Sequence, residues 1–350
     1  MLKIPHVRQK EKKTRRVAVA ISRKRARNPS VKRFVRISLS LLALGVALIV
    51  RTSLLNRAAT ETADDPPVPI ELPTEFDPLL AQIELLRPVH EAKRPNQPGD
   101  WLERFHEDGQ SFPQLVMYHS RKPLNDAYSA IDIQPLGEFD ETQRRIIDQT
   151  ADFMERFFGV SVRIQETRLL EEIPTNARRM RDDVEQLLTT WIMNERLRPQ
   201  VRPDAMATIA LVTCDLWPGN LNWVFGQASI RDRIGVWSLH RNGDPRESEA
   251  AYRLCLLRTL KTAVHETGHM LGSPHCVAYE CGMNGMRSRE ENDRRSLEFC
   301  PECQAKIWWN CGADPVRRCQ SLIEFCEQTG LDEEATFFRK ERDVLRIRSD

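Results

Sequence analysis

Beyond its first 36 residues, this sequence has no excess of positive charge. The first 36 residues hold 14 of the 52 Lys and Arg but only one of the 50 Asp and Glu, which leaves 38 basic against 49 acidic side chains in residues 37–350. Proteins that bind nucleic acids attract the phosphate backbone with a basic surface. The charge balance therefore excludes nucleic acid as the partner of the main body of the chain.

Charge of either sign is absent between Ile37 and Val50. This apolar run, extendable to Leu55, follows the basic tail of residues 1–36, and that order is typical of a segment that enters a membrane with its N-terminus in the cytoplasm. No A-x-A cleavage site follows the run. We therefore predict a basic cytoplasmic tail over 1–36 and an uncleaved transmembrane signal anchor over 37–55. Cleavage and release, and a buried or interfacial helix, remain as alternatives.

Eight prolines lie within residues 56–98, and they favour an extended spacer ahead of a folded domain over 99–350. In that domain, short apolar strands alternate with amphipathic helices, which predicts an α/β (or α+β) fold with a mixed sheet packed on helices. We expect strands over 130–134, 160–165, 206–213, 223–225 and 234–239, and helices over 141–158, 176–197, 301–309, 315–328 and 332–347. The last three helices would form a C-terminal helical extension.

The most specific pattern in the chain is HETGHMLGSPH, which ends an apolar, helix-like stretch. His265 and His269 are one helical turn apart and face the same way, so both imidazoles can bind one metal ion. Gly272 can end the helix with a positive φ and turn the chain, which would bring His275 to the same ion. Three nitrogen ligands and one open position are typical of catalytic zinc.

Glu266 follows the first of these histidines without being a natural third ligand. A carboxylate at that position suits a base that takes a proton from metal-bound water and returns it to a leaving amine. The short form HExxH also arises by chance on ordinary helices, with all three side chains exposed to solvent. The full HExxHxxGxxH is far more restrictive, and here it lies on a helix whose Leu254, Leu257 and Val264 are spaced for burial.

Four cysteines at positions 276, 281, 300 and 303 follow the third histidine. Four residues separate the first pair, two separate the second, and eighteen lie between the pairs. Such spacing is typical of a closed, structural zinc site with four thiolates. The remaining five cysteines cannot all pair with one another, and the sequence leaves open one disulfide among the last three. These five are Cys214, Cys255, Cys311, Cys319 and Cys326.

The complete pattern, HExxHxxGxxHC followed by CxM and a distant CxxC, resembles that of the archaemetzincins, a family in the metzincin clan of zinc peptidases. The resemblance covers about residues 99–306 and includes IDIQPLGEFD at 131–140 and NWVFGQA at 222–228, which look like family strands. One departure from the family pattern is Pro274. It restricts Ser273 to extended backbone and could reshape the turn before the third histidine.

This resemblance implies two zinc ions, one catalytic and one structural. The residues that it assigns are His265, His269 and His275 on the catalytic zinc, Glu266 as the base, Met283 as the methionine turn below the site, and Cys276, Cys281, Cys300 and Cys303 on the structural zinc. It also implies an edge strand that holds extended substrate beside the cleft, for which residues 234–239 are the candidate. No tyrosine closely follows Met283, so no second oxyanion stabiliser is expected.

We therefore predict a membrane-anchored zinc metallopeptidase that hydrolyses peptides or proteins as a monomer, with its catalytic domain outside the cytoplasm. No cysteine precedes Cys214, so activity is not expected to be held in check by a cysteine switch. Two alternatives come from other classes. One is a zinc-stabilised, membrane-anchored binding module without turnover, and the other is a zinc hydrolase that acts on a bond other than the peptide bond.

Overall fold

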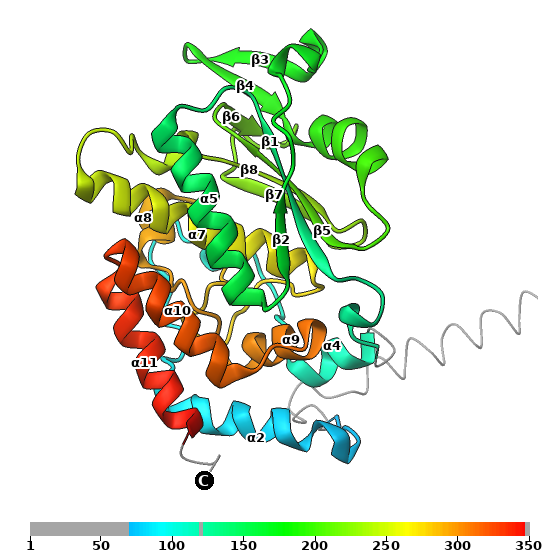
Figure 1. Cartoon of the computed structure of the whole chain (residues 1–350), viewed down its shortest axis with the longest axis vertical. Coiled ribbons are helices and arrows are strands. Elements are labelled where there is room, and N and C mark those ends of the chain that lie inside the picture. The colour runs from blue at the N-terminus through cyan, green and yellow to red at the C-terminus, as the bar shows by residue number, and fades with distance from the viewer. Residues whose placement is uncertain (1–69, 119–121, 347–350) are drawn as a thin grey trace, which may run out of the picture. The chain divides into compact units, whose positions relative to one another are not determined.

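The computed structural model of the chain describes residues 70–118 and 122–346, which belong to one compact unit. This unit contains a five-stranded sheet in the order β2-β1-β5-β8-β7, in which only β7 and β8 are antiparallel neighbours (Figure 1). The predicted mixed α/β class is confirmed. The strands are β1 (Ala130–Leu136), β2 (Ser161–Ile164), β5 (Ala205–Val212), β7 (Gly226–Ser229) and β8 (Ile234–Ser238).

A smaller sheet stands where the sequence predicted a helix over 176–197, and that prediction was wrong. β3 (Arg178–Arg181) and β4 (Val184–Leu188) form an antiparallel hairpin, and β6 (Asp215–Trp217) pairs with β4. The two turn residues, Asp182 and Asp183, have φ values of 50° and 61°. Two consecutive residues with positive φ match the twist of a tight hairpin, and aspartate tolerates this backbone. Helical backbone is limited to the 3-10 turn Thr175–Ala177 before β3 and to the part of the stretch after β4.

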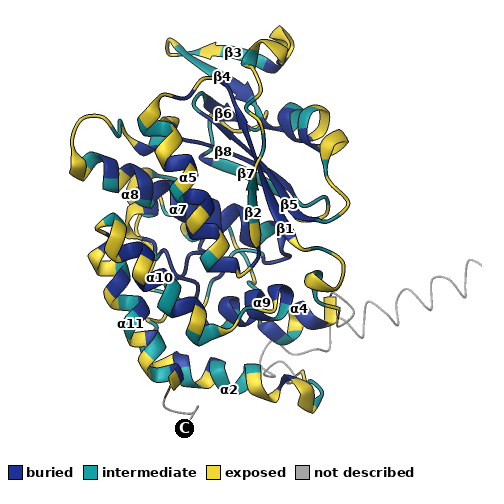
Figure 2. Ribbon diagram, viewed as in Figure 1, coloured by how far each residue is buried: buried dark blue, intermediate teal, exposed yellow. Residues whose placement is uncertain are grey.

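Helices α5 (Glu141–Phe158) and α7 (Glu249–Met270) cover one face of the five-stranded sheet, and the helical stretch after β4, together with residues of the small sheet, covers the other. Ile131 and Ile133 of β1 belong to the main apolar core together with α5 and α7. Leu136 of the same strand joins a second core with residues of β4 and of the helical stretch after it. Strands buried on both faces are expected for parallel sheets, and Figure 2 shows β1, β5 and β8 in the colour of buried residues.

The helix α5 begins and ends where the sequence predicted. At its start the Asp140 side chain accepts a hydrogen bond from Gln143 N, and the Gln143 side chain accepts one from Asp140 N. At its end Gly159 adopts a left-handed φ of 69°. The capping box and the glycine satisfy backbone groups that a helix leaves free at its termini, so both limits were encoded locally.

Residues 70–98 of the predicted proline-rich spacer over 56–98 are folded, which corrects the expectation of an extended linker for this part, and residues 56–69 lie outside the described residues. It contains α2 (Asp77–Leu86), flanked by the 3-10 turns Thr74–Phe76 and Arg87–Val89. Pro78 and Pro88 lie in the first turns of such elements, where a missing N–H leaves no bond unmade. These two prolines therefore start helical turns and do not hold the backbone extended.

The predicted C-terminal helices are present as α9 (Pro301–Cys311), α10 (Pro315–Thr329) and α11 (Asp332–Arg346). Helix α2 packs against α9 and α11, and Figure 1 shows these helices gathered away from the two sheets. The buried residues of α2 are Ile83 and Leu86. Residues 70–98 therefore belong to the same folded unit as the rest of the described chain.

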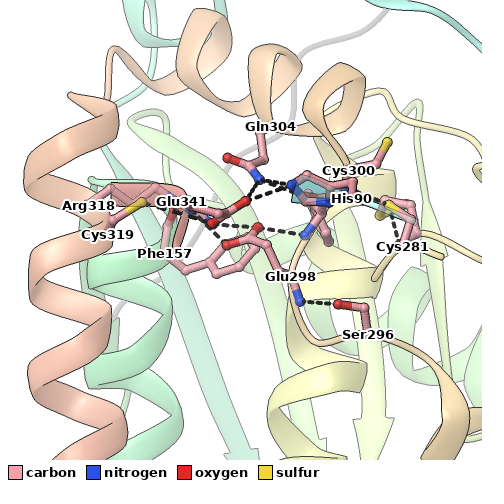
Figure 3. A network of polar contacts seen from close by, with 12 residues as sticks. His90, Phe157, Cys281, Ser296, Glu298, Cys300, Gln304, Arg318, Cys319 and Glu341 are labelled. Atoms are coloured by element: carbon pink, nitrogen blue, oxygen red, sulfur yellow. Dashed lines mark hydrogen bonds and ion pairs between the residues drawn. The ribbon is translucent and has the colours of Figure 1, made fainter. Parts of the chain in front are cut away.

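A buried polar network also joins this segment to the C-terminal helices (Figure 3). Nε2 of His90 lies 2.8 Å from Oε1 of Glu341, and the amide of Gln304 contacts both side chains. Beside them, Arg318 donates two hydrogen bonds of 2.9 Å to Glu298, and both of these side chains are buried. A buried charge is tolerated only with such partners, so the network fixes how these elements pack.

No helix among residues 70–118 and 122–346 is both long and apolar enough to cross a bilayer. The predicted basic tail over 1–36 and signal anchor over 37–55 lie outside the described residues. The predicted single-pass membrane location, with the catalytic domain outside the cytoplasm, is contradicted, because no such helix is found in the part of the chain that the structure describes.

Candidate metal centres and active-site cleft

Two of the three motif histidines lie in the last turns of α7. This helix is capped by Ser248, whose hydroxyl accepts a hydrogen bond from Ala251 N, and its C-terminal half is buried against β7 and β8. Just after the helix, Gly272 adopts a φ of 91°. The chain turns there, as the sequence predicted, and returns toward the helix end.

The side chains of His265, His269 and His275 converge on one point. Their closest ring nitrogens all lie within 4.8 Å of one another, and the Nε2 atoms of His265 and His269 are 3.1 Å apart. Nδ1 of His265 faces Gly282 O at 2.9 Å, and Nδ1 of His269 faces Ser273 O at 2.7 Å. When His269 donates Nδ1–H to Ser273 O, its Nε2 is unprotonated, which is the form that binds a metal ion. The same tautomer of His265 requires its Nδ1–H to face Gly282 O and not Arg295, because a guanidinium only donates.

The third histidine is held by side chains from a distant part of the sequence. Nδ1 of His275 lies 2.9 Å from each carboxylate oxygen of Glu107. The ring of Trp101 packs edge-on against that of His275, with 5.0 Å between the centroids. Both residues come from the segment that precedes β1. The loop with Pro274 thus brings His275 to the other two histidines, although it departs from the family pattern.

Burial keeps the two histidines of α7 neutral. It lowers the pKa of His269 to about 3 and that of His265 well below its usual range, and the nearby charge of Arg295 adds to the second shift. The buried guanidinium of Arg295 lies 2.7 Å from Nδ1 of His265 and donates hydrogen bonds to Lys261 O and Asn292 Oδ1. Neutral imidazoles do not have to lose a proton before they bind a metal ion.

Glu266 lies beside the histidines on the wall of a cleft of about 520 Å³. Burial raises the pKa of its carboxyl group to about 8. A Cβ atom at Gly226 would lie 2.9 Å from Oε1 of Glu266, so glycine lets the backbone of β7 approach this carboxylate closely. Residues 220–228 form one side of the cleft, and Trp101, Phe105 and Arg287 contribute to its lining.

The strand beside this cleft differs from the predicted one. Residues 234–239 were expected at the edge of the sheet, but β8 lies between β5 and β7 and is paired on both sides. The edge strand is β7, whose residues Gly226, Gln227 and Ala228 line the cleft. Its outer backbone groups have no partner strand in the described sheet, so β7 takes the place that the sequence assigned to 234–239.

Met283 lies against α7 between the turns that carry His265 and His269. A Cβ atom at Gly268 would overlap Sδ of Met283 and would lie 3.1 Å from Cζ of Phe299. Met283 is fully buried, and its carbonyl accepts a hydrogen bond from Cys276 N. The methionine therefore packs beneath the histidine cluster, and its backbone contacts the loop that carries the cysteines.

The four cysteines with metal-site spacing also converge, with their sulfur atoms within 4.8 Å of one another. Sγ of Cys281 accepts hydrogen bonds from Met283 N at 3.4 Å and Cys300 N at 3.1 Å. Backbone donors of this kind stabilise a thiolate, which is the form of cysteine that binds zinc. All nine cysteines lie within the described residues and all are free thiols, so the structure contains none of the disulfides that the sequence left open.

One short loop joins the two clusters. Cys281 supplies a thiol to the cysteine cluster, Gly282 supplies the carbonyl that holds His265, and Met283 packs under the histidines. Sequence patterns indicated Cys281 and Met283. They did not indicate Glu107 or Arg295, because neither belongs to a motif and each meets the site only through the tertiary fold.

Comparisons with known proteins agree with the geometry. The model of peptidase family M54 matches residues 138–308. Archaemetzincin-2 of Pongo abelii is 28% identical over 275 residues, which cover 68% of this chain and 74% of that protein. An archaemetzincin of Thermococcus kodakarensis is 35% identical over 114 residues, which cover 31% of this chain and 59% of that protein.

Among solved structures, an archaemetzincin from Methanopyrus kandleri is 26% identical, with a TM-score of 0.44, and the alignment covers 53% of this chain and 97% of that one. The family model and the curated relatives together support the assignment of this chain to peptidase family M54, the archaemetzincins, and indicate that it is a zinc metallopeptidase.

Proposed function

We propose that the chain hydrolyses peptide bonds with one catalytic zinc ion bound by His265, His269 and His275. The observation that carries the proposal is the convergence of three imidazoles on the wall of an open cleft, each with its Nδ1 beside an acceptor. Three nitrogen donors that face a cleft fit a zinc ion that keeps a position free for reactants. We further propose that a second zinc ion fills the buried four-cysteine cluster and is purely structural.

Glu266 acts as the general base and acid in this proposal. A zinc ion, when bound, supplies a Lewis acid that lowers the pKa of a water molecule and polarises the scissile carbonyl. Glu266 takes a proton from the attacking water and passes it to the leaving amine. Burial raises the pKa of this carboxyl group, and the positive charge of a zinc ion beside it would shift the equilibrium back toward the ionised form that accepts a proton.

The edge strand β7 binds the substrate in this proposal. An extended peptide beside β7 can pair with its free backbone groups, which would lay the scissile bond along the cleft wall that contains Glu266. Phe105, Trp223 and Phe225 also line the cleft and offer apolar surface to substrate side chains. Backbone pairing holds a peptide without regard to its sequence, so these side chains would decide preference.

We propose that the catalytic domain includes residues 70–98 and continues through the C-terminal helical extension. The support is the packing of α2 on α9 and α11 and the buried contact between His90 and Glu341. Its monomeric state remains a prediction.

Peptide hydrolysis by the full chain loaded with zinc tests the proposed function. We expect cleavage of members of a peptide library, with a loss of at least a hundredfold in kcat/KM for Glu266→Gln and little change for Glu333→Gln on α11, which is matched in charge and lies outside the cleft. Zinc binding without cleavage by the wild type would favour a binding module. Cleavage of esters but not peptides would favour a hydrolase of another bond.

A further inference from the structure

Glu107 presents both of its carboxylate oxygens to one proposed zinc ligand. Each oxygen lies 2.9 Å from Nδ1 of His275, and the side chains of Glu107 and His275 are 27% and 16% exposed. Among the described residues, the acceptors at this distance from Nδ1 of the other two histidines are backbone carbonyls. A hydrogen bond to an ionised acceptor is stronger than one to a neutral carbonyl, so His275 is held differently from its partners.

The segment around Glu107 is fixed on both sides of this contact. Trp101 N donates a 2.8 Å hydrogen bond to Glu291, and Phe112 N donates one of the same length to Glu302 on α9. Lys306, also on α9, donates to Gln110 O. The carboxylate of Glu107 is therefore delivered by a segment that is bonded to the body of the domain. This segment precedes residue 138, where the match to the family model begins.

A neighbouring pair shows what an incidental contact in this segment looks like. His106 and Asp108 approach within 3.9 Å, but their side chains are 98% and 97% exposed. Such a pair is screened by water and contributes little. Glu107 has the opposite surroundings, because it is mostly buried and faces a histidine whose other nitrogen belongs to the metal cluster.

We propose that Glu107 is a positioning residue for the zinc site. By accepting Nδ1–H of His275, the carboxylate fixes the tautomer and the orientation of the ring and makes Nε2 a stronger donor. The inference rests on the proposed function for the identity of the metal site. It adds that the site is completed by a residue outside the motif and outside the range matched by the family model.

Zinc affinity of the full chain tests this role without relying on catalysis. Zinc is titrated against a competing chromophoric chelator, and Co²⁺ substitution reports the two sites separately, because thiolate ligands give charge-transfer absorption and imidazoles do not. Glu107→Gln keeps an oxygen that can accept Nδ1–H but removes the charge. We expect 10- to 100-fold weaker zinc binding at the histidine site and an unchanged cysteine site. The matched control, Asp108→Asn, should bind within about twofold of the wild type, as expected for an exposed charge.

The effect of Glu107→Gln in a chain that already carries His275→Gln separates the positioning of His275 from a general loss of structure. If Glu107 acts through His275, then Glu107→Gln should have no further effect on the zinc affinity of a chain that already carries His275→Gln. An equal loss in both backgrounds, or zinc binding by Glu107→Gln that equals that of Asp108→Asn, would overturn the proposal. If the wild-type histidine site binds no zinc, the proposed function fails together with this inference. If it binds zinc and Glu107→Gln changes nothing, only this inference fails.

Discussion

Replacing Gly268 with alanine would insert one methyl group between α7 and the methionine beneath the histidines. The added Cβ would overlap Sδ of Met283 and lie 3.1 Å from Cζ of Phe299 and 3.2 Å from Cε of Met283. Met283 and Phe299 are fully buried, so neither can turn out into solvent. The methyl group can be accommodated only if the floor of the proposed zinc site moves.

Two opposing effects set the size of the change in stability. Alanine in place of glycine inside a helix ordinarily stabilises by about 1 kcal/mol. Overpacking of a filled core costs about 1–3 kcal/mol, and a full overlap with a buried sulfur belongs in the upper part of that range. Gly268→Ala should therefore lower the free energy of unfolding by about 1–2 kcal/mol, by the difference between these terms.

Urea unfolding of the zinc-loaded chain measures this change, and a double-mutant cycle with Met283→Ala assigns its cause. Truncating Met283 should itself destabilise the fold, but it removes the sulfur that the new methyl meets. The double variant should then be more stable than the sum of the single changes predicts, by about 1 kcal/mol or more. The structural reasoning is refuted if Gly268→Ala is as stable as the wild type, or if the two changes are additive.

Gly226→Ala should lower kcat/KM at least tenfold with little change in melting temperature, because the Cβ atom of the new alanine would lie 2.9 Å from Oε1 of Glu266. An unchanged kcat/KM would contradict the proposed path of β7 along the cleft. A chain that begins at residue 99 should have a lower melting temperature than one that begins at residue 70, because it lacks the buried side chains of α2. Each of these side chains contributes about 1.5–3 kcal/mol to the free energy of unfolding. Equal melting temperatures would contradict the inclusion of residues 70–98 in the domain. Burial lowers the pKa of Lys261 from 10.5 to about 8, so the folded protein releases this proton at a lower pH than the unfolded chain does. Between pH 8 and 10.5, urea unfolding should therefore show the wild type gaining stability relative to Lys261→Met. A difference in stability that stays flat or falls over this range would be inconsistent with the burial of Lys261.

Features set by residues close in sequence were predictable. The four-residue spacing of His265 and His269 on a helix, the glycine turn before His275 and the capping box of α5 each act within about ten residues. The two cysteine pairs were also predictable, because metal-site spacing constrains short stretches. In all these cases the periodicity of one helix or the needs of one ion restrict which residues can occur.

Features that depend on tertiary contacts or on unusual backbone were missed. The hairpin at Asp182 and Asp183 was hidden because an apolar pattern with helical spacing follows it, and only the positive φ of two aspartates marks the turn. No sequence pattern within either strand indicates that β8 lies inside the sheet and β7 at its edge, because strand order is set by packing. Glu107 reaches His275 across 168 positions of sequence, and no spacing rule covers that distance.

The metal content of the purified full chain, compared between the wild type and His269→Ala, tests the central claim most directly. We predict two zinc ions per wild-type chain and one in the variant, because the histidine site loses a ligand while the four-cysteine site is unchanged. A single zinc ion in both proteins would contradict it, since the converging histidines would then hold no metal.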